Sequence, residues 1–366
     1  MDQRQQSFRS IFSFLVGLIL IICTFIPTQP VYAASLIVNT NADNTVAEGL
    51  CSLREAIVNA NNNAATYSDC AAGSGADIIS FVGNYTITLA GSQLPAITST
   101  ITINGNGMAN TIIQANANNP VTNLPAVATH ENRVFEVANG ASLTLDGMTI
   151  RHGRCTGGCS STITNGASGI LNQGILTVTN STLSGNLAST FGGGIDTTFN
   201  HTLIVTNSIF SGNSASFGGG IANSGNMSVT NGTFSGNTTS TSGGGIYTSS
   251  TGITTVENSI FSTNRGVTGG GIRNDGTVSI TGSTLSGNSA SNSGGGLFNT
   301  SNGIATVTNS IFSSNSSSAG GGIFNFNSLT VADSTFSDNG NNSAFGGGIY
   351  NSRLFRSNCD KQHLFW

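Results

Sequence analysis

The residues best suited to catalysis lie close together in the first half of the chain. Asp146, Arg151 and His152 fall within one short stretch. Enzymes that cleave polysaccharides need carboxylates and basic side chains on one face of the protein. These three residues are therefore the catalytic candidates for a polysaccharide-acting lyase or hydrolase. Farther along, charged residues are scattered over different repeats, and Arg273 with Asp275 predicts only a surface ion pair.

Cysteine is the second residue type that could do chemistry. Outside the N-terminal apolar run and the last residues, the chain has an even set, namely Cys51, Cys70, Cys155 and Cys159. An even set is typical of disulfides in exported proteins, and proximity in sequence predicts the pairs Cys51–Cys70 and Cys155–Cys159. A metal site made by His152, Cys155 and Cys159 would lack a fourth ligand. The sequence therefore indicates disulfides, and it indicates neither a metal nor another cofactor.

Residues 1–34 have the pattern of a secretory signal peptide. Arg4 and Arg9 precede an apolar run over residues 11–26, and small residues then favour cleavage after Ala33 or Ala34. The run is shorter than the roughly 20 residues of a membrane-spanning helix. We therefore expect a secreted protein, or one on the outer cell surface, with no membrane span in the mature chain.

The composition argues against one class of partner. Charged residues make up 7% of the chain, the net charge is -4, and Lys361 is the only lysine. A protein that binds nucleic acid would carry a basic stripe, so we expect no nucleic-acid partner. Val, Ile, Phe and Thr recur in fixed register, which indicates a folded chain and not a disordered one.

A repeated phrase organises the second half of the chain and would position any site there. Its clearest copy is MSVTNGTFSGNTTSTSGGGI, residues 227–246. The glycine triplets recur every 25 or 26 residues, and they begin at Gly192, Gly218, Gly243, Gly269, Gly294, Gly320 and Gly346. This fixed period predicts a solenoid of stacked coils. Equivalent apolar residues, such as Val178 and Val205, should then stack inside the tube.

One asparagine recurs at the bend after a strand in every copy. Stacked asparagine side chains can hydrogen-bond to one another, and asparagine tolerates the left-handed backbone of a tight bend. We therefore expect a structural turn ladder in this conformation, made by Asn186, Asn213, Asn237, Asn264, Asn288, Asn315 and Asn339. Their spacing alternates between 27 and 24 residues, so the duplicated unit is a pair of coils. Every second coil should then carry a longer loop, and these loops would form a ridge suited to contacts.

The phrase CSLREAI at residues 51–57 predicts a short capping helix. Ser52 and Glu55 form a capping box, and apolar residues follow at helical spacing. The chain here resembles the bacterial family of exported proteins named after its CSLREA motif. The repeats are similar to those of polymorphic outer membrane proteins, which carry GG-aliphatic triplets and FxxN tetrads such as residues 210–213 and 234–237. The resemblance implies an all-β, right-handed parallel β-helix, with cap and irregular coils over residues 35–165 and regular repeats over residues 166–352.

Residues 353–366 depart from the repeat. They contain the only lysine and the only tryptophan of the chain. A shift of one base in suitable codons for residues 359–366 would restore VTNSTFSG, which is the repeat phrase. We therefore expect a frameshifted or truncated product of a longer gene.

These features favour a non-catalytic secreted or cell-surface β-helix, a structural or adhesin-like module within a longer protein. Its partner would be a surface ligand such as a carbohydrate or a protein. A polysaccharide-acting lyase or hydrolase is one alternative. An ice-binding solenoid is another, because threonines flank the inward valine in segments such as residues 177–179 and 306–308. Equivalent positions in other coils, Ile204 and Glu257 among them, interrupt these threonine rows.

Overall fold

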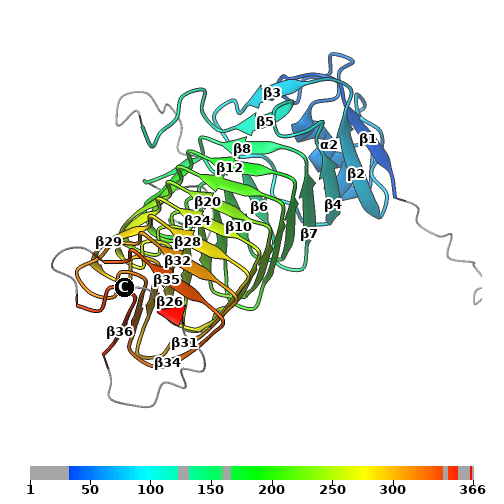
Figure 1. Ribbon diagram of the computed structural model, residues 1–366. Coiled ribbons are helices and arrows are strands. Elements are labelled where there is room, and N and C mark those ends of the chain that lie inside the picture. Colours follow the sequence, from blue (N-terminus) through cyan, green and yellow to red (C-terminus); the bar gives the residue numbers. More distant parts are fainter. Residues whose placement is uncertain are drawn as a thin grey trace, which may run out of the picture. The chain divides into compact units, whose positions relative to one another are not determined.

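The structure, a computed structural model, describes residues 33–122, 132–157, 159, 166–340, 345–352 and 363–364. The chain divides into two units, Met1–Tyr32 and Ala33–Trp366. The predicted signal peptide, apart from Ala33 and Ala34, lies in the first unit, outside the described residues. The described residues of the second unit form a β-solenoid of about ten turns with one short helix (Figure 1). Among the described residues, no helix is long and apolar enough to cross a membrane.

Four parallel sheets run along the solenoid, and the coils over residues 142–299 pass through them in the order A, B, D and C. Sheet A consists of β1 (Ser35–Val38), β2 (Ala76–Phe81), β4 (Thr100–Asn104), β7 (Ser142–Asp146), β11 (Ile175–Thr179), β15 (Thr202–Thr206), β19 (Asn226–Thr230), β23 (Ile253–Glu257), β27 (Thr277–Thr281), β31 (Ile304–Thr308) and β34 (Ser328–Ala332). Sheet B consists of β3 (Tyr85–Thr88), β5 (Thr111–Gln114), β8 (Thr149–Arg151), β12 (Thr182–Ser184), β16 (Ile209–Ser211), β20 (Thr233–Ser235), β24 (Ile260–Ser262), β28 (Thr284–Ser286), β32 (Ile311–Ser313), β35 (Thr335–Ser337) and β37 (His363–Leu364).

The other two sheets are shorter. Sheet D consists of β9 (Arg154–Cys155), β13 (Leu187–Ala188), β17 (Ser214–Phe217), β21 (Thr238–Ser242), β25 (Arg265–Thr268) and β29 (Ser289–Ser293). Sheet C consists of β6 (Phe135–Val137), β10 (Ile170–Asn172), β14 (Ile195–Thr197), β18 (Ile221–Asn223), β22 (Ile246–Thr248), β26 (Ile272–Asn274), β30 (Leu297–Asn299), β33 (Ile323–Asn325) and β36 (Ile349–Asn351). The predicted all-β parallel β-helix is therefore confirmed.

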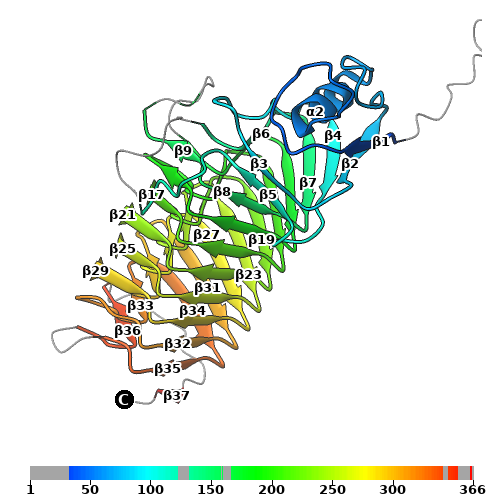
Figure 2. The ribbon, with the colours of Figure 1, turned by 90° about the horizontal axis from the view of Figure 1, so that it is seen from above.

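A short helix lies at the β1 end of the solenoid, as the sequence predicts. Helix α2 (Leu53–Asn62) contacts β1 and β2 (Figure 2). It begins with the predicted capping box, in which Ser52 Oγ accepts the Glu55 N–H and Glu55 Oε2 accepts the Ser52 N–H. Its buried face includes Leu53, Ala56 and Ile57. The helix thus covers apolar residues of the first coils that no preceding coil covers.

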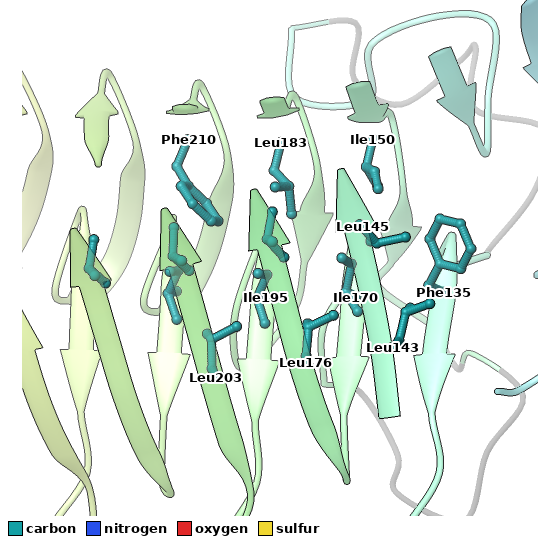
Figure 3. Close-up of a cluster of buried hydrophobic side chains, with 14 of the residues drawn as sticks. Phe135, Leu143, Leu145, Ile150, Ile170, Leu176, Leu183, Ile195, Leu203 and Phe210 are labelled. Carbon is teal, nitrogen blue, oxygen red and sulfur yellow. The ribbon is translucent and has the colours of Figure 1, made fainter. Parts of the chain in front are cut away.

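Equivalent apolar residues stack along the interior, because the coils pair in register. Val178 pairs with Val205, and Leu183 pairs with Phe210. All four side chains are fully buried, and Figure 3 shows Leu183 and Phe210 pointing into the same interior column. Phenylalanine rings continue this column, and the centroids of Phe210 and Phe234 are 4.8 Å apart. Because coils are spaced about 4.8 Å apart, stacked coils bury residues that a single coil would expose.

The predicted asparagine ladder forms, but its backbone conformation differs from the prediction. Asn186 Nδ2 donates to Asn213 Oδ1 over 2.9 Å, and the backbone N–H of Asn186 donates to the same oxygen. The left-handed residue is not the asparagine but the residue before it, for example Gly185 with φ of 60°. The asparagine side chain points inward to the asparagine of the next coil. The residue before it therefore takes the left-handed conformation that makes the turn. Positions 212, 236, 263, 287, 314 and 338 repeat this arrangement.

A second buried asparagine ladder, which we did not predict, lies at the end of the sheet C strands. Asn274 Nδ2 donates to Asn299 Oδ1 over 2.8 Å, and Asn299 Nδ2 donates to Asn325 Oδ1 over 2.7 Å. Asn325 continues the ladder to Asn351. Each of these four asparagines stands two residues after the aliphatic residue that follows a glycine triplet, so a sequence signal for this ladder exists.

The links from sheet C to sheet A alternate in length, which confirms the predicted pairing of coils. Long links span residues 198–201, 249–252 and 300–303, and the links between them span residues 224–225, 275–276 and 326–327. The three long links lie between sheets C and A in alternate coils, where the ridge is predicted. We call these three loops the ridge.

The last described residues pair with the final sheet B strand of the repeats. His363 pairs with Thr335, and Leu364 pairs with Phe336. The shifted reading frame would place the Thr-Phe of the repeat at these same two positions. The other residues of the predicted aberrant tail, residues 353–362, 365 and 366, lie outside the described residues.

Candidate functional site

The predicted catalytic residues do not form one acid–base group. Asp146, on the outer face of sheet A at the end of β7, accepts a hydrogen bond from Asn180 Nδ2 over 2.8 Å. Arg151, at the far end of β8, donates from Nε to Gln114 Oε1 over 2.7 Å. His152 Nδ1 lies 3.0 Å from the carbonyl oxygen of Asn116. Burial lowers the pKa of this imidazole and is the largest influence on it. The positive charge of Arg151 also lowers the pKa, whereas hydrogen bonds with nearby backbone carbonyls raise it. Each candidate is thus engaged with a separate neighbour.

The four predicted cysteines form two disulfides, Cys51–Cys70 and Cys155–Cys159, as predicted. Cys155 and Cys159 are therefore not free thiolates, and the alternative metal site with His152 loses two of its ligands. In the described part of the chain, no group of three or more His, Cys, Asp or Glu side chains is placed to hold a metal ion.

Glycine triplets make the corner between sheets D and C, and the outer faces of the two sheets meet there. The first glycine of each triplet is left-handed, as Gly218 is with φ of 65°. A Cβ at Gly220 would lie 2.5 Å from the carbonyl oxygen of Gly245 in the next coil, so only glycine permits this approach. Phe217, at the end of β17, packs on Tyr247 of β22, with ring centroids 5.2 Å apart. Outward side chains of both sheets therefore touch at this D–C corner.

A continuous stack of planar side chains fills the D–C corner. We call it the corner stack; its members in order are Phe191, Phe217, Tyr247, Arg273, Phe298, Phe324 and Tyr350. Adjacent ring centroids lie 5.0 to 5.3 Å apart, and the Arg273 guanidinium carbon lies 5.9 Å and 5.6 Å from the centroids of its two aromatic neighbours. Phe298 and Phe324 are only 8% and 7% exposed. The ring faces in the middle of the stack therefore contact one another, whereas Phe191 at its end is 40% exposed.

Arg273 is held in the stack by a polar network. Its Nε and Nη2 donate to the Asp275 carboxylate over 2.8 and 3.2 Å, and its Nη1 donates to Ser242 Oγ and Thr268 Oγ1. Tyr247 Oη also donates to Asp275. Burial, followed by the charge and the hydrogen bond of Asp275, raises the pKa of Tyr247 to about 12. The predicted ion pair exists, but it is a part-buried element of the corner and not a free surface pair.

A buried ionic group lies at the N-terminal end of the same corner. We call it the Arg133 cluster; its members are Arg133, Glu136 and Asp196. The Arg133 side chain is fully buried, and its Nη1 lies 3.3 Å from Glu136 Oε2. Asp196 stands two coils beyond Glu136 in the same outward column of sheet C, with Leu171 between them. Arg133 Nη2 also donates to the carbonyl oxygen of Gly166, over 3.4 Å.

The electrostatics of the Arg133 cluster are unusual for this protein. Burial raises the pKa of Asp196 to about 7, and the positive charge of Arg133 only partly opposes this rise. Burial lowers the pKa of Arg133, and Glu136 and Asp196 oppose that change. Arg133 Nε is buried without a hydrogen-bond partner. Sequence reasoning missed this cluster, because Arg133 lies in an irregular coil while Asp196 belongs to the repeats.

Comparisons with known proteins do not assign a function. No protein-family model, no curated protein and no solved structure matches this chain. The resemblance to CSLREA proteins and to polymorphic outer membrane proteins therefore stays a prediction.

Proposed function

We propose that this protein is a non-catalytic, secreted or surface-displayed β-helix that serves as a structural or adhesive module. The observation that carries the proposal is the filled D–C corner. A hydrolase that binds a polymer along a concave face needs free surface there with its acid and base. Here the corner stack lies along the corner from Phe191 to Tyr350, and Arg273 forms an ion pair with Asp275. A partner would then contact the outer faces of the sheets and the ridge.

Two features support export and contact at the ridge. The buried disulfides suit an oxidising compartment, as does the N-terminal signal pattern. Phe199, in the first ridge loop, is 56% exposed, and a large exposed apolar side chain is typical of a contact surface when others lie near it. Ile204 and Ile253, on the sheet A strands that follow two of the ridge loops, are also exposed.

Binding and turnover measured on one preparation of the secreted chain test the proposal. We expect retention on an immobilised-glycan array or on protein-coated beads, without release of new reducing ends from soluble polysaccharides. Phe199→Ser should weaken retention, whereas the control Phe345→Ser, at an exposed phenylalanine away from the ridge, should not. N-terminal sequencing of the exported chain should begin after Ala33 or Ala34. Polysaccharide cleavage by the wild type, or no retention on any surface, would contradict the proposal.

The Arg133 cluster favours a second candidate function, a polysaccharide hydrolase. Asp196 would carry a proton near neutral pH, as a general acid must, and Glu136 could serve as the base. This candidate requires release of reducing ends that Asp196→Asn and Glu136→Gln abolish and Asp146→Asn preserves. Turnover that survives Asp196→Asn would eliminate it.

A further inference from the structure

The outer face of sheet A is a regular two-dimensional array. We call the outward side chains of β11, β15, β19, β23, β27, β31 and β34 the A face. These strands pair residue for residue, whereas sheet D shows register shifts, for example between β17 and β21. Neighbouring strands lie about 4.8 Å apart and outward residues recur about every 6.6 to 6.8 Å along a strand. The A face therefore repeats in two directions, as a crystal face does.

The chemistry of the A face is equally uniform. Its middle column carries a hydroxyl in every coil but one and consists of Thr177, Ile204, Ser228, Thr255, Ser279, Thr306 and Thr330. The flanking columns hold further threonines together with Ile175, Ile253 and Ile304, which are 49–52% exposed. None of the outward residues is aromatic, Lys or Arg, and Glu257 is the only charged one.

Sheet B extends the array around the next corner. Its outward positions alternate strictly between threonine and isoleucine, from Thr182 and Ile209 to Ile311 and Thr335. Beside them runs an unbroken column of serines, from Ser184 to Ser337. The alternation follows the same two-coil unit as the ridge. Exposed isoleucines in this arrangement are a repeated surface feature and not isolated exceptions.

We propose that the A face binds ice. A small soluble ligand would meet only a few of these hydroxyl and methyl groups, and each contact would contribute little. A periodic solid can meet all of them at once, so that many small contacts sum across one rigid surface. Hydroxyls can hydrogen-bond surface water, while isoleucine and threonine methyl groups are favourably removed from liquid water.

Charge and ring content favour ice over a crystalline polysaccharide. Lysine, arginine and carboxylate side chains hold their own hydration and would disturb an ordered water layer, and the A face carries only Glu257. Aromatic rings provide large flat contact area for sugar surfaces, and the A face has none. Of the interruptions noted in the sequence, Glu257 lies in a flanking column, whereas Ile204 replaces a hydroxyl in the middle column. Asn226 and Ala332 are further exceptions in the flanking columns.

Thermal hysteresis and ice-crystal shaping by the purified secreted chain test this proposal. Thr255→Tyr places a bulky ring at the centre of the A face, and Ser291→Tyr makes a matched change at an exposed position on sheet D. Both variants keep the interior unchanged, and circular dichroism melting checks their folds. We expect hysteresis in the wild type, loss of at least half of it in Thr255→Tyr, and full retention in Ser291→Tyr.

Three results would overturn the proposal. The first is a wild-type chain that neither lowers the freezing point below the melting point nor shapes ice crystals. The second is an equal effect of the two tyrosine variants, which would show that the A face is not the active surface. The third is co-sedimentation with microcrystalline cellulose in the absence of ice activity, which would assign the array to a crystalline polysaccharide. Because the A face and the ridge carry different variants, failure here is distinguishable from failure of the adhesive function.

Discussion

Replacing Asp196 by asparagine should remove a pH-dependent weakness of the fold. Burial raises the pKa of this carboxyl from its ordinary value of 3.8 to about 7, so the folded protein holds the proton more tightly than the unfolded chain does. The resulting stabilisation is complete below about pH 4 and is lost as the pH rises through 7. A rise of about 3 pKa units corresponds to about 4 kcal/mol at most over this window, because each unit is worth about 1.4 kcal/mol.

Urea or thermal unfolding of the wild type and Asp196→Asn at pH 4.5 and pH 8 measures this effect. The asparagine side chain is neutral at both values and nearly isosteric, so the two proteins should differ by only about 1 kcal/mol at pH 4.5. At pH 8 the variant should be the more stable one, by up to about 4 kcal/mol. Glu257→Gln, at an exposed position of β23, is the control and should follow the wild type. The reasoning is refuted if Asp196→Asn and the wild type lose equal stability between pH 4.5 and pH 8.

Three further predictions concern the parts that hold the coils together. Asn237→Ala leaves two donors of Asn213 without an acceptor, so it should lower the free energy of unfolding by about 2–4 kcal/mol in urea titrations. The control Asn226→Ala, at an exposed position of β19, should cost less than about 1 kcal/mol. Arg273→Ala interrupts the corner stack and leaves a part-buried carboxylate, so the melting temperature should fall by several degrees, whereas Arg265→Ala at an exposed position should leave it nearly unchanged. Cys51→Ser opens a disulfide that closes a short loop and should cost about 3 kcal/mol, measured against the wild type with and without reductant.

The sequence predicted the periodic part of this structure well because periodicity is itself the signal. Once the coil length is known, the positions of Val178 and Val205 follow, and so does the alternation of the ridge loops. The left-handed positions were also readable, since glycine precedes most of the ladder asparagines, as Gly212 and Gly236 do. The prediction placed the left-handed conformation on the asparagines because asparagine tolerates it. It was wrong because each asparagine side chain must point inward to bond the next coil.

The Arg133 cluster could not be predicted in the same way. Its geometry depends on the pairing of Phe135 with Ile170, which sets β6 of an irregular coil beside the first regular strand of sheet C. No repeat spacing fixes that register in the sequence. The corner stack was hidden for a different reason, because its members come from two different positions of the repeat. Phe217 ends a sheet D strand, while Tyr247 follows a glycine triplet.

The scarcity of charge in this chain follows from the way its coils stack. In a parallel, in-register solenoid, every side chain has its equivalents about 4.8 Å away in the coils on both sides. A charge that recurred in each repeat would therefore face like charges along the whole column, at a repeated cost. Glu257 accordingly lies between Thr230 and Thr281, and Arg273 lies between Tyr247 and Phe298. Neutral hydroxyls and amides carry no such penalty, and amides gain a hydrogen bond at each step. Stacking thus selects for the Ser, Thr and Asn columns seen here, and it makes each charge that interrupts a column a natural first target for mutagenesis.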